Sequence, residues 1–413
     1  MSEFWTNFWL YVSMPFISGI VGWGTNVVAL KMTFYPLEFI GKPPFLGWQG
    51  IIPRKAEKMA SLACDLMTSK LISIEEIFTR LDPKRVAAEM EPALLNLIET
   101  ITNQIMMEQA ASMWEMIPQR VKDEIYHRAK DEAPTVIATM MQEIKDNINE
   151  LFDLKAMVTD SLVRDKQLLN EIFLRVGNKE FKFIEISGFY FGFAFGVIQM
   201  ILWIFYKGSW QLPVCGLIVG YATNWLALKM IFEPAKPTTF GPYKILGREF
   251  GPWIIQGLFL KRQQEVAGDY GALISKEILH AENIFMGILK GPSSDKLFHL
   301  IQRHVKRSID QYAGITKPFI ALTIGTKNYI NMKDSAVNHI MEHTPESLKH
   351  VHVYAEEAWD IENTLRVKMQ ALTPEEFVNL LRPAFQEDEW ILILVGAILG
   401  MFVGFFQLFV MFS

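Results

Sequence analysis

Residues 22–36 read Gly-Trp-Gly-Thr-Asn-Val-Val-Ala-Leu-Lys-Met-Thr-Phe-Tyr-Pro, and residues 220–234 read Gly-Tyr-Ala-Thr-Asn-Trp-Leu-Ala-Leu-Lys-Met-Ile-Phe-Glu-Pro. Nine of the fifteen positions are identical, and both stretches lie in apolar sequence. This agreement predicts a tandem duplication in which each copy places a Thr-Asn pair inside a membrane span. Polar groups in hydrocarbon are costly and usually have a specific partner.

Four segments are apolar enough to cross a bilayer, which takes about 20 residues for roughly 30 Å of hydrocarbon. They are residues 8–32, 183–206, 212–232 and 390–412. Aromatic side chains, which favour the membrane–water interface, lie near their ends at Trp5, Trp9, Trp203, Tyr206, Trp210 and Trp390. We therefore predict four transmembrane helices.

The second and fourth of these segments repeat as well. Glycines at four-residue steps, followed by a glutamine, occur as Gly188, Gly192, Gly196 and Gln199, and again as Gly396, Gly400, Gly404 and Gln407. Repeat one therefore covers 1–207 and repeat two covers 208–413. The short linker 207–211 allows only a tight hairpin, which predicts parallel repeats related by a pseudo-two-fold axis along the membrane normal.

The two polar stretches, about 55–180 and 262–386, show helical periodicity. The apolar residues Ile137, Met141, Ile144, Ile148 and Leu151 follow a 4-3-4-3 spacing, which is typical of one helix face. Proline in a first turn predicts helix starts at Asp82-Pro83, Ala133-Pro134 and Thr373-Pro374. No alternating strand pattern of useful length occurs. The predicted fold is an all-α integral membrane protein with a large extramembrane helical domain.

Positive charge near the spans favours a cytoplasmic location for the polar stretches. On their side lie Lys31, Lys42, Arg54, Lys55, Lys179, Lys182, Lys229, Lys236, Lys244, Arg248, Lys261 and Arg262, whereas the opposite side offers only Lys207. The N-terminal segment has no Lys or Arg and no secretory cleavage pattern, so we expect it to be retained. These observations predict a multi-pass protein of the cell (inner) membrane.

The combination of motifs resembles the bacterial membrane proteins that carry domain of unknown function 445. The motifs are Gly22-x2-Thr25-Asn26-x2-Ala29-x2-Met32-x-Phe34-x-Pro36, Gly50-x2-Pro53-Arg54-Lys55, and the Gly188/Gly192/Gly196/Gln199 run with its copy. The second copy departs at Leu260, which stands where Pro53 stands in the first. The resemblance implies a multi-pass membrane protein, and because the family has no assigned reaction there are no catalytic residues to carry over.

The Thr-Asn pairs allow two interpretations. Thr25 with Asn26, and Thr223 with Asn224, lie on helix faces with small residues that let another helix approach closely. Asn26 and Asn224 could be ligands along a solute or ion path. Alternatively they hydrogen-bond a partner helix and fix packing, which the lack of deep acidic residues favours. We expect both to reach the glycine-bearing spans, with Gln199 and Gln407 as candidate partners.

The glycine faces and the basic segments also have a structural and a functional interpretation. Glycines at four-residue steps form a groove for close helix contact, either within one chain or in a homo-oligomer.

The basic pairs Arg54-Lys55 and Lys261-Arg262 follow apolar residues just beyond a span. They either set the topology or lie on the membrane surface at anionic lipid headgroups.

The remaining features argue against catalysis and nucleic-acid binding. A net charge of −5 gives no basic footprint, and two isolated cysteines give no disulfide or zinc pattern. His339 and His343 have a spacing that zinc sites use, but a solvated helix face explains them better. No phosphate-binding or nucleophile motif occurs. We expect no enzyme activity, cofactor or bound metal.

The leading hypothesis is a non-enzymatic membrane scaffold or assembly protein, associated with the bilayer and with copies of itself. The alternative is an oligomeric transporter or channel, including one for lipids or other amphiphiles. Four spans are few for a monomeric transporter, so the alternative requires an oligomer. Acidic residues deep in the spans would favour transport, and the sequence has none there.

Overall fold

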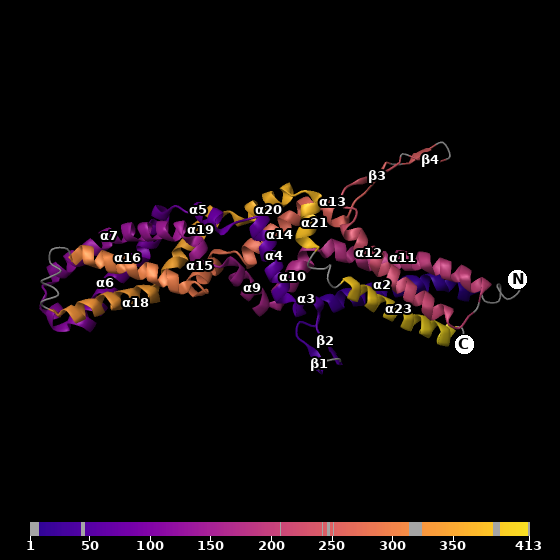
Figure 1. Ribbon diagram of the computed structural model, residues 1–413, viewed down its shortest axis with the longest axis horizontal. Helices are drawn as coiled ribbons and strands as arrows, with labels where there is room; N and C mark the ends of the chain where they lie inside the picture. The colour runs from indigo at the N-terminus through magenta and orange to yellow at the C-terminus, as the bar shows by residue number, and fades with distance from the viewer. Residues whose placement is uncertain are drawn as a thin grey trace. The chain divides into compact units, whose positions relative to one another are not determined.

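The computed structural model describes residues 8–42, 46–206, 208–241, 243–245, 248–250, 252–313, 324–382 and 389–411. It is mostly helical, and the chain divides into two compact units (Figure 1). The membrane unit contains Met1–Met67, Thr159–Ala272 and Leu365–Ser413. The helical unit contains Thr68–Val158 and Leu273–Thr364. Each unit therefore contains segments from both halves of the sequence.

The prediction of four helices that are long and apolar enough to cross a membrane is confirmed among the described residues. They are α2 (Phe8–Phe34), α11 (Asn178–Phe205), α12 (Gln211–Phe232) and α23 (Glu389–Met411). Even the 22 residues of α12 extend over about 33 Å, enough to cross the hydrocarbon layer. Residue 412, the predicted end of the fourth span, and Lys207, the predicted repeat boundary, lie outside the described residues.

The four helices form one bundle. α2 packs along α11, α12 packs along α23, and α12 and α2 connect the two pairs. A cluster of Tyr11, Met14, Trp203 and Leu212 fills one end, where α2 begins and α23 ends (Figure 1). At the other end Ile51, which follows α2, packs with Ala29 and Leu392. The polar segments of the membrane unit are thus joined to this second end.

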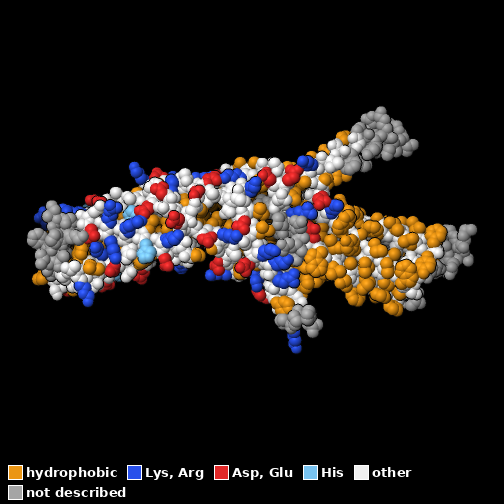
Figure 2. Space-filling model, in the orientation of Figure 1, with side chains coloured by type: hydrophobic (Ala, Val, Ile, Leu, Met, Phe, Trp, Pro, Cys, Tyr) orange, Lys and Arg blue, Asp and Glu red, His pale blue; other side chains and the backbone are white. Residues whose placement is uncertain are grey.

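Large apolar side chains cover the outside of the bundle. Figure 2 shows them gathered over the spanning helices, whereas Lys, Arg, Asp and Glu cover the other described helices. In water such an apolar surface would be unstable, and in a bilayer it contacts lipid tails. Exposed examples are Trp9, Phe16, Ile20, Tyr190, Phe205, Ile218, Trp225, Phe402, Phe406 and Phe409.

Short hairpins follow α2 and α12, in the loops between the spans and the polar stretches, so the fold is mostly helical rather than all-α. β1 (Ile40–Lys42) pairs with β2 (Leu46–Trp48), β3 (Thr238–Phe240) with β6 (Trp253–Ile255), and β4 (Tyr243–Ile245) with β5 (Arg248–Phe250), all antiparallel. Strands of three residues are too short to produce a recognisable alternation of apolar and polar residues.

Each hairpin returns the chain to the end of its span. The Gly50 amide donates to the Pro36 carbonyl at 2.9 Å, and the Gly257 amide donates to the Pro234 carbonyl at 3.0 Å. Added side chains at Gly50 or Gly257 would collide with the last residues of α2 or α12. These contacts position the short helices α3 (Ile51–Arg54) and α13 (Leu258–Lys261). The basic segments therefore lie directly beside the ends of the spans.

The remaining described helices complete the two units. In the membrane unit, or at its boundary, lie α4 (Ala56–Lys70), α9 (Leu154–Arg164), α10 (Lys166–Val176), α14 (Gln263–Glu277), α20 (Ile361–Ala371) and α21 (Pro374–Leu381). The helical unit contains α5 (Ile74–Thr79), α6 (Pro83–Met116), α7 (Gln119–Asp146), α8 (Ile148–Leu151), α15 (Ala281–Lys290), α16 (Ser294–Ala313), α18 (Thr326–Leu348), the 3-10 turn η2 (Lys349–Val351) and α19 (His352–Trp359).

Two of the three predicted proline helix starts are confirmed. Asp82 caps α6 by accepting from the Lys84 amide, and Thr373 forms a capping box with Glu376 at the start of α21. The start predicted at Ala133-Pro134 is wrong, because Pro134 lies inside α7. Packing of α7 along α6 outweighs the single backbone hydrogen bond that proline removes.

Candidate functional site

The first candidate site is the contact between α2 and α11. Gly22 faces Gly188 so closely that a Cβ on Gly22 would collide with the Gly188 carbonyl. Asn26, which is fully buried, donates from Nδ2 to the Ile184 carbonyl at 2.6 Å. Asn26 therefore spans the helix interface and hydrogen-bonds main chain one turn before Gly188.

The contact between α12 and α23 has the same construction. A Cβ on Gly220 would collide with the Gly396 carbonyl. Asn224 is 3% exposed and donates from Nδ2 to the Leu392 carbonyl at 2.8 Å. The contacts of Gly220 and Asn224 with α23 thus correspond to those of Gly22 and Asn26 with α11.

The threonines beside these asparagines bond within their own helix. Thr25 Oγ1 donates to the Gly22 carbonyl at 3.1 Å, and Thr223 Oγ1 donates to the Gly220 carbonyl at 3.4 Å. A hydroxyl that donates to its own helix satisfies its hydrogen without a ligand. In this structure the two threonines thus bond their own helices, whereas the two asparagines bond the facing helices.

The predicted glutamine partners have other neighbours. Gln199 accepts from Ser18 Oγ at 3.2 Å rather than bonding Asn26, and Gln407 is buried without a hydrogen bond to Asn224. The correction has a geometric reason: Gln199 lies fifteen residues, about 22 Å, along α11 from Ile184. Gln199 Nε2 and Asn26 Oδ1 are buried without a hydrogen-bond partner among the described residues.

The other glycines of the two runs make the same kind of close contact. A Cβ on Gly192 would meet the Ser18 carbonyl, and one on Gly196 would meet Pro15. On the second pair, Gly400 faces Gly216, and Gly404 faces the main chain at Leu212 and Pro213. The sequence interpretation did not single out Ser18 and Gly216. Their spacing of four residues from Gly22 and Gly220 is the signal that could have identified them.

The basic segments differ between the two halves of the chain. Arg54 and Lys261 are exposed and form no ion pair with a described residue, and Lys55 is half-buried. Arg262 is held inside the protein: its Nη1 lies 2.6 and 2.7 Å from the two carboxylate oxygens of Glu180. Unlike Arg54 and Lys261, Arg262 has its charge paired with a buried carboxylate, and its predicted place on the membrane surface stays a prediction.

The Arg262 pair belongs to a larger charged cluster. The Glu180 side chain is 1% exposed, and Arg262 Nε also donates to Glu265 at 2.9 Å. Lys179 Nζ lies 2.5 Å from the other oxygen of Glu265. Hydrogen bonds from Arg262 and then Lys179 lower the pKa of Glu265 to about 2. The cluster connects the start of α11 to the segment that follows α13.

The histidines do not assemble a metal site in the part of the chain that the structure describes, where no group of three or more His, Cys, Asp or Glu has suitable geometry. His339 Nε2 lies 3.2 Å from Glu108 Oε1, and His343 lines a cavity in the helical unit. The two side chains thus have separate surroundings despite their helical spacing.

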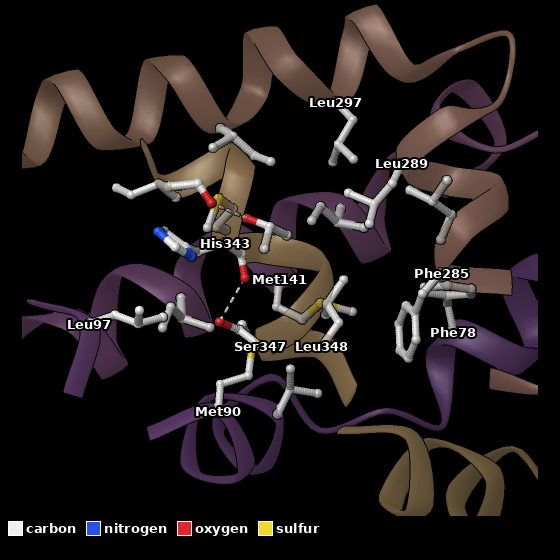
Figure 3. A pocket seen from close by; sticks show the side chains of 18 of the residues that line it. Phe78, Met90, Leu97, Met141, Phe285, Leu289, Leu297, His343, Ser347 and Leu348 are labelled. Atoms are coloured by element: carbon white, nitrogen blue, oxygen red, sulfur yellow. Dashed lines mark hydrogen bonds between the residues drawn. The ribbon is translucent and has the colours of Figure 1, made fainter. Parts of the chain in front are cut away.

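The cavity is a second candidate site, and the sequence interpretation did not predict it. It has a volume of about 130 Å³ and lies among α5, α6, α7, α15, α16 and α18 (Figure 3). Its lining is apolar apart from His343, Thr344 and Ser347. Ile137, Met141 and Ile144 of the predicted apolar helix face contribute to its wall.

Comparison with known proteins places part of the chain near bacterial membrane proteins. The chain is 29% identical over 154 residues to a UPF0754 membrane protein of Nostoc sp., 33% identical over 99 residues to one of Bacillus pumilus, and 31% identical over 104 residues to one of Exiguobacterium sibiricum. These relatives are membrane proteins by name.

The similarity covers a limited part of each protein. The matched stretches amount to 36%, 24% and 25% of this chain, and to the same shares of the three relatives. No family model matches the chain, so the resemblance to proteins with domain of unknown function 445 stays an interpretation. No solved structure matches it either.

Proposed function

We propose that this protein is a non-enzymatic membrane scaffold, in which a packed four-helix anchor carries the helical unit as the part that binds partners. One observation carries the proposal: the side chains of the two Thr-Asn pairs hydrogen-bond main-chain carbonyls of the bundle. Asn26 and Asn224 donate to facing helices, and Thr25 and Thr223 donate to their own. A conduit needs polar groups that remain available to a solute.

The proposal includes a tandem duplication of the anchor. The equivalent contacts support it, since Asn26 bonds Ile184 and Asn224 bonds Leu392. Gly50 and Gly257 also make equivalent backbone bonds to Pro36 and Pro234. Because α2 with α11 and α12 with α23 run in the same order and direction, the proposed repeats are parallel. A homo-oligomer would form through the exposed outer faces of these helices.

In our proposal the polar segments face the cytoplasm and the protein resides in the inner membrane. The exposed cations Arg54 and Lys261, beside the ends of the spans, would lie at anionic headgroups, where each cation contributes about 1 kcal/mol. The charge of Arg262 is paired with Glu180, so we base this association with the bilayer on Arg54 and Lys261.

Cysteine labelling tests the orientation. In a chain without Cys64 and Cys215, a membrane-impermeant maleimide added to intact cells should modify Ser209→Cys, which lies between α11 and α12. Asp131→Cys on α7 should react only after the cells are opened. Labelling of position 131 in intact cells, with position 209 protected, would reverse the orientation.

The alternative function is an oligomeric transporter or channel. The buried atoms Gln199 Nε2 and Asn26 Oδ1 favour it, because they have no hydrogen-bond partner among the described residues. Unpaired polar atoms inside a bundle are binding groups for a solute or a water chain. A transport path would therefore depend on Asn26 and Gln199.

Reconstitution in proteoliposomes separates the two functions. We expect the parent protein to pass no ions and to move no fluorescent phospholipid between leaflets faster than empty vesicles do. Saturable flux in the parent would contradict the scaffold, and its loss in Gln199→Leu would support a conduit. The matched variant Gln119→Leu changes an exposed glutamine of α7, so it should leave any such flux unchanged.

A further inference from the structure

We propose that the cavity of the helical unit is a binding site for a small hydrocarbon group, an uncharged ring or a short alkyl group. Figure 3 shows side chains such as Leu97, Met141 and Leu297 pointing into it from different helices. The full lining consists of Phe78, Val86, Met90, Leu97, Ile101, Ile137, Met140, Met141, Ile144, Phe285, Ile288, Leu289, Leu297, Ile301, Ile340, His343, Thr344, Ser347 and Leu348.

Apart from the His343 ring, the lining favours an apolar occupant over water or a charged ligand. Thr344 Oγ1 donates to the Ile340 carbonyl at 2.7 Å, and Ser347 Oγ donates to the His343 carbonyl at 3.1 Å, as the dashed line in Figure 3 marks. The hydroxyl hydrogens of this wall are therefore used within α18. A buried water needs two to four polar partners, and the His343 ring is the main polar group that this lining leaves available. An apolar occupant needs no polar partner.

The size of the cavity sets the size of the group. Its volume is about 130 Å³, and an apolar cavity of about 150 Å³ accommodates benzene. The site therefore takes about six carbon atoms. Three methionines, Met90, Met140 and Met141, lie in the wall, and their unbranched side chains can adjust to occupants of different shape.

Helices from both halves of the sequence form the wall of the cavity. α6 and α7 precede residue 158, whereas α15, α16 and α18 follow residue 273. An occupant that contacts both sets stabilises their association, because it binds only the assembled unit. The hydrocarbon group could belong to a free small molecule or to the end of a lipid acyl chain, and both have the same contact chemistry.

Benzene is the probe for the test, with the full-length chain stripped of lipid and kept soluble in a lipid-free amphipathic polymer. Thr344→Leu adds apolar atoms to the cavity. Thr139→Leu is the matched control, because Thr139 also donates to a carbonyl of its own helix, at 2.8 Å, but is exposed on α7. Saturating benzene should raise the unfolding midpoint of the parent and of Thr139→Leu by a few degrees, and leave Thr344→Leu unchanged.

Two outcomes overturn the proposal: no rise in the parent, or an equal rise in Thr344→Leu, which would mean that benzene binds elsewhere on the protein. If Thr344→Leu does not fold, Leu97→Phe fills the cavity from α6. A fluorine NMR titration with fluorobenzene then tests the proposal. It requires a saturable signal of bound fluorobenzene in the parent and no such signal in the variant whose cavity is filled. The same titration on protein that keeps its lipid distinguishes the two sources of the hydrocarbon group. If the natural occupant is a lipid acyl chain, only the stripped protein should respond to benzene. If it is a free small molecule, both preparations should respond.

Discussion

Replacing Gly22 by leucine should remove about 3 kcal/mol or more of stability, because the new side chain would have to occupy the position of the Gly188 main chain. A backbone cannot give way like the end of a flexible side chain, so α2 and α11 must separate. Separation also breaks the hydrogen bond from Asn26 to Ile184. Thermal unfolding in a mild detergent, followed by circular dichroism, measures the loss.

Gly24 provides the control on the same helix. A Cβ on Gly24 would meet no atom within 4 Å, so Gly24→Leu adds the same side chain where it points away from α11. This variant should unfold within about 1 kcal/mol of the parent. Equal midpoints for Gly22→Leu and Gly24→Leu would show that α2 does not pack on α11 through its glycine face.

Removing the charge of Arg262 should have an effect of similar size. Arg262→Met leaves the buried Glu180 carboxylate without its partner, and breaking a buried pair in this way typically costs about 3–5 kcal/mol. The neighbouring exposed cation gives the comparison: Lys261→Met should cost less than about 1 kcal/mol. Chemical unfolding of both variants, read from intrinsic fluorescence, measures the difference.

A second substitution tests whether the unpaired charge of Glu180 causes the loss of stability in Arg262→Met. In Arg262→Met with Glu180→Leu, no buried charge remains, so much of the stability should return. If the double variant is no more stable than Arg262→Met, the loss comes from packing around the Arg262 side chain, and the buried ion pair is not its source.

The spans could be predicted from the sequence because their signals are local. Hydrophobic length, the Thr-Asn motif and the glycine spacing each lie within one helix. The partners of Asn26 and Gln199 could not be predicted in the same way. Asn26 bonds a main-chain carbonyl, and every residue of the facing helix has one, so side-chain chemistry does not identify it. Ser18 becomes a partner of Gln199 only through the register of α2 against α11.

The water-facing parts were less predictable for related reasons. The pairing of Arg262 with Glu180 joins residues 82 positions apart, and many carboxylates were equally plausible from the sequence. The apolar periodicity of residues 137–151 predicts a buried helix face but does not say what covers it. In the structure the cover comes from α16 as well as α6, and hence in part from the other half of the chain.

The divided construction of the helical unit has a consequence for protein synthesis. α6 and α7 leave the ribosome about 200 residues before the last helices of their unit. At 5–20 residues per second, that delay lasts roughly 10–40 s. During this time Ile137 and Met141 have no cover from α16, while α11 and α12 are being made. The nascent chain therefore exposes part of this apolar face until α16 in its second half has been made.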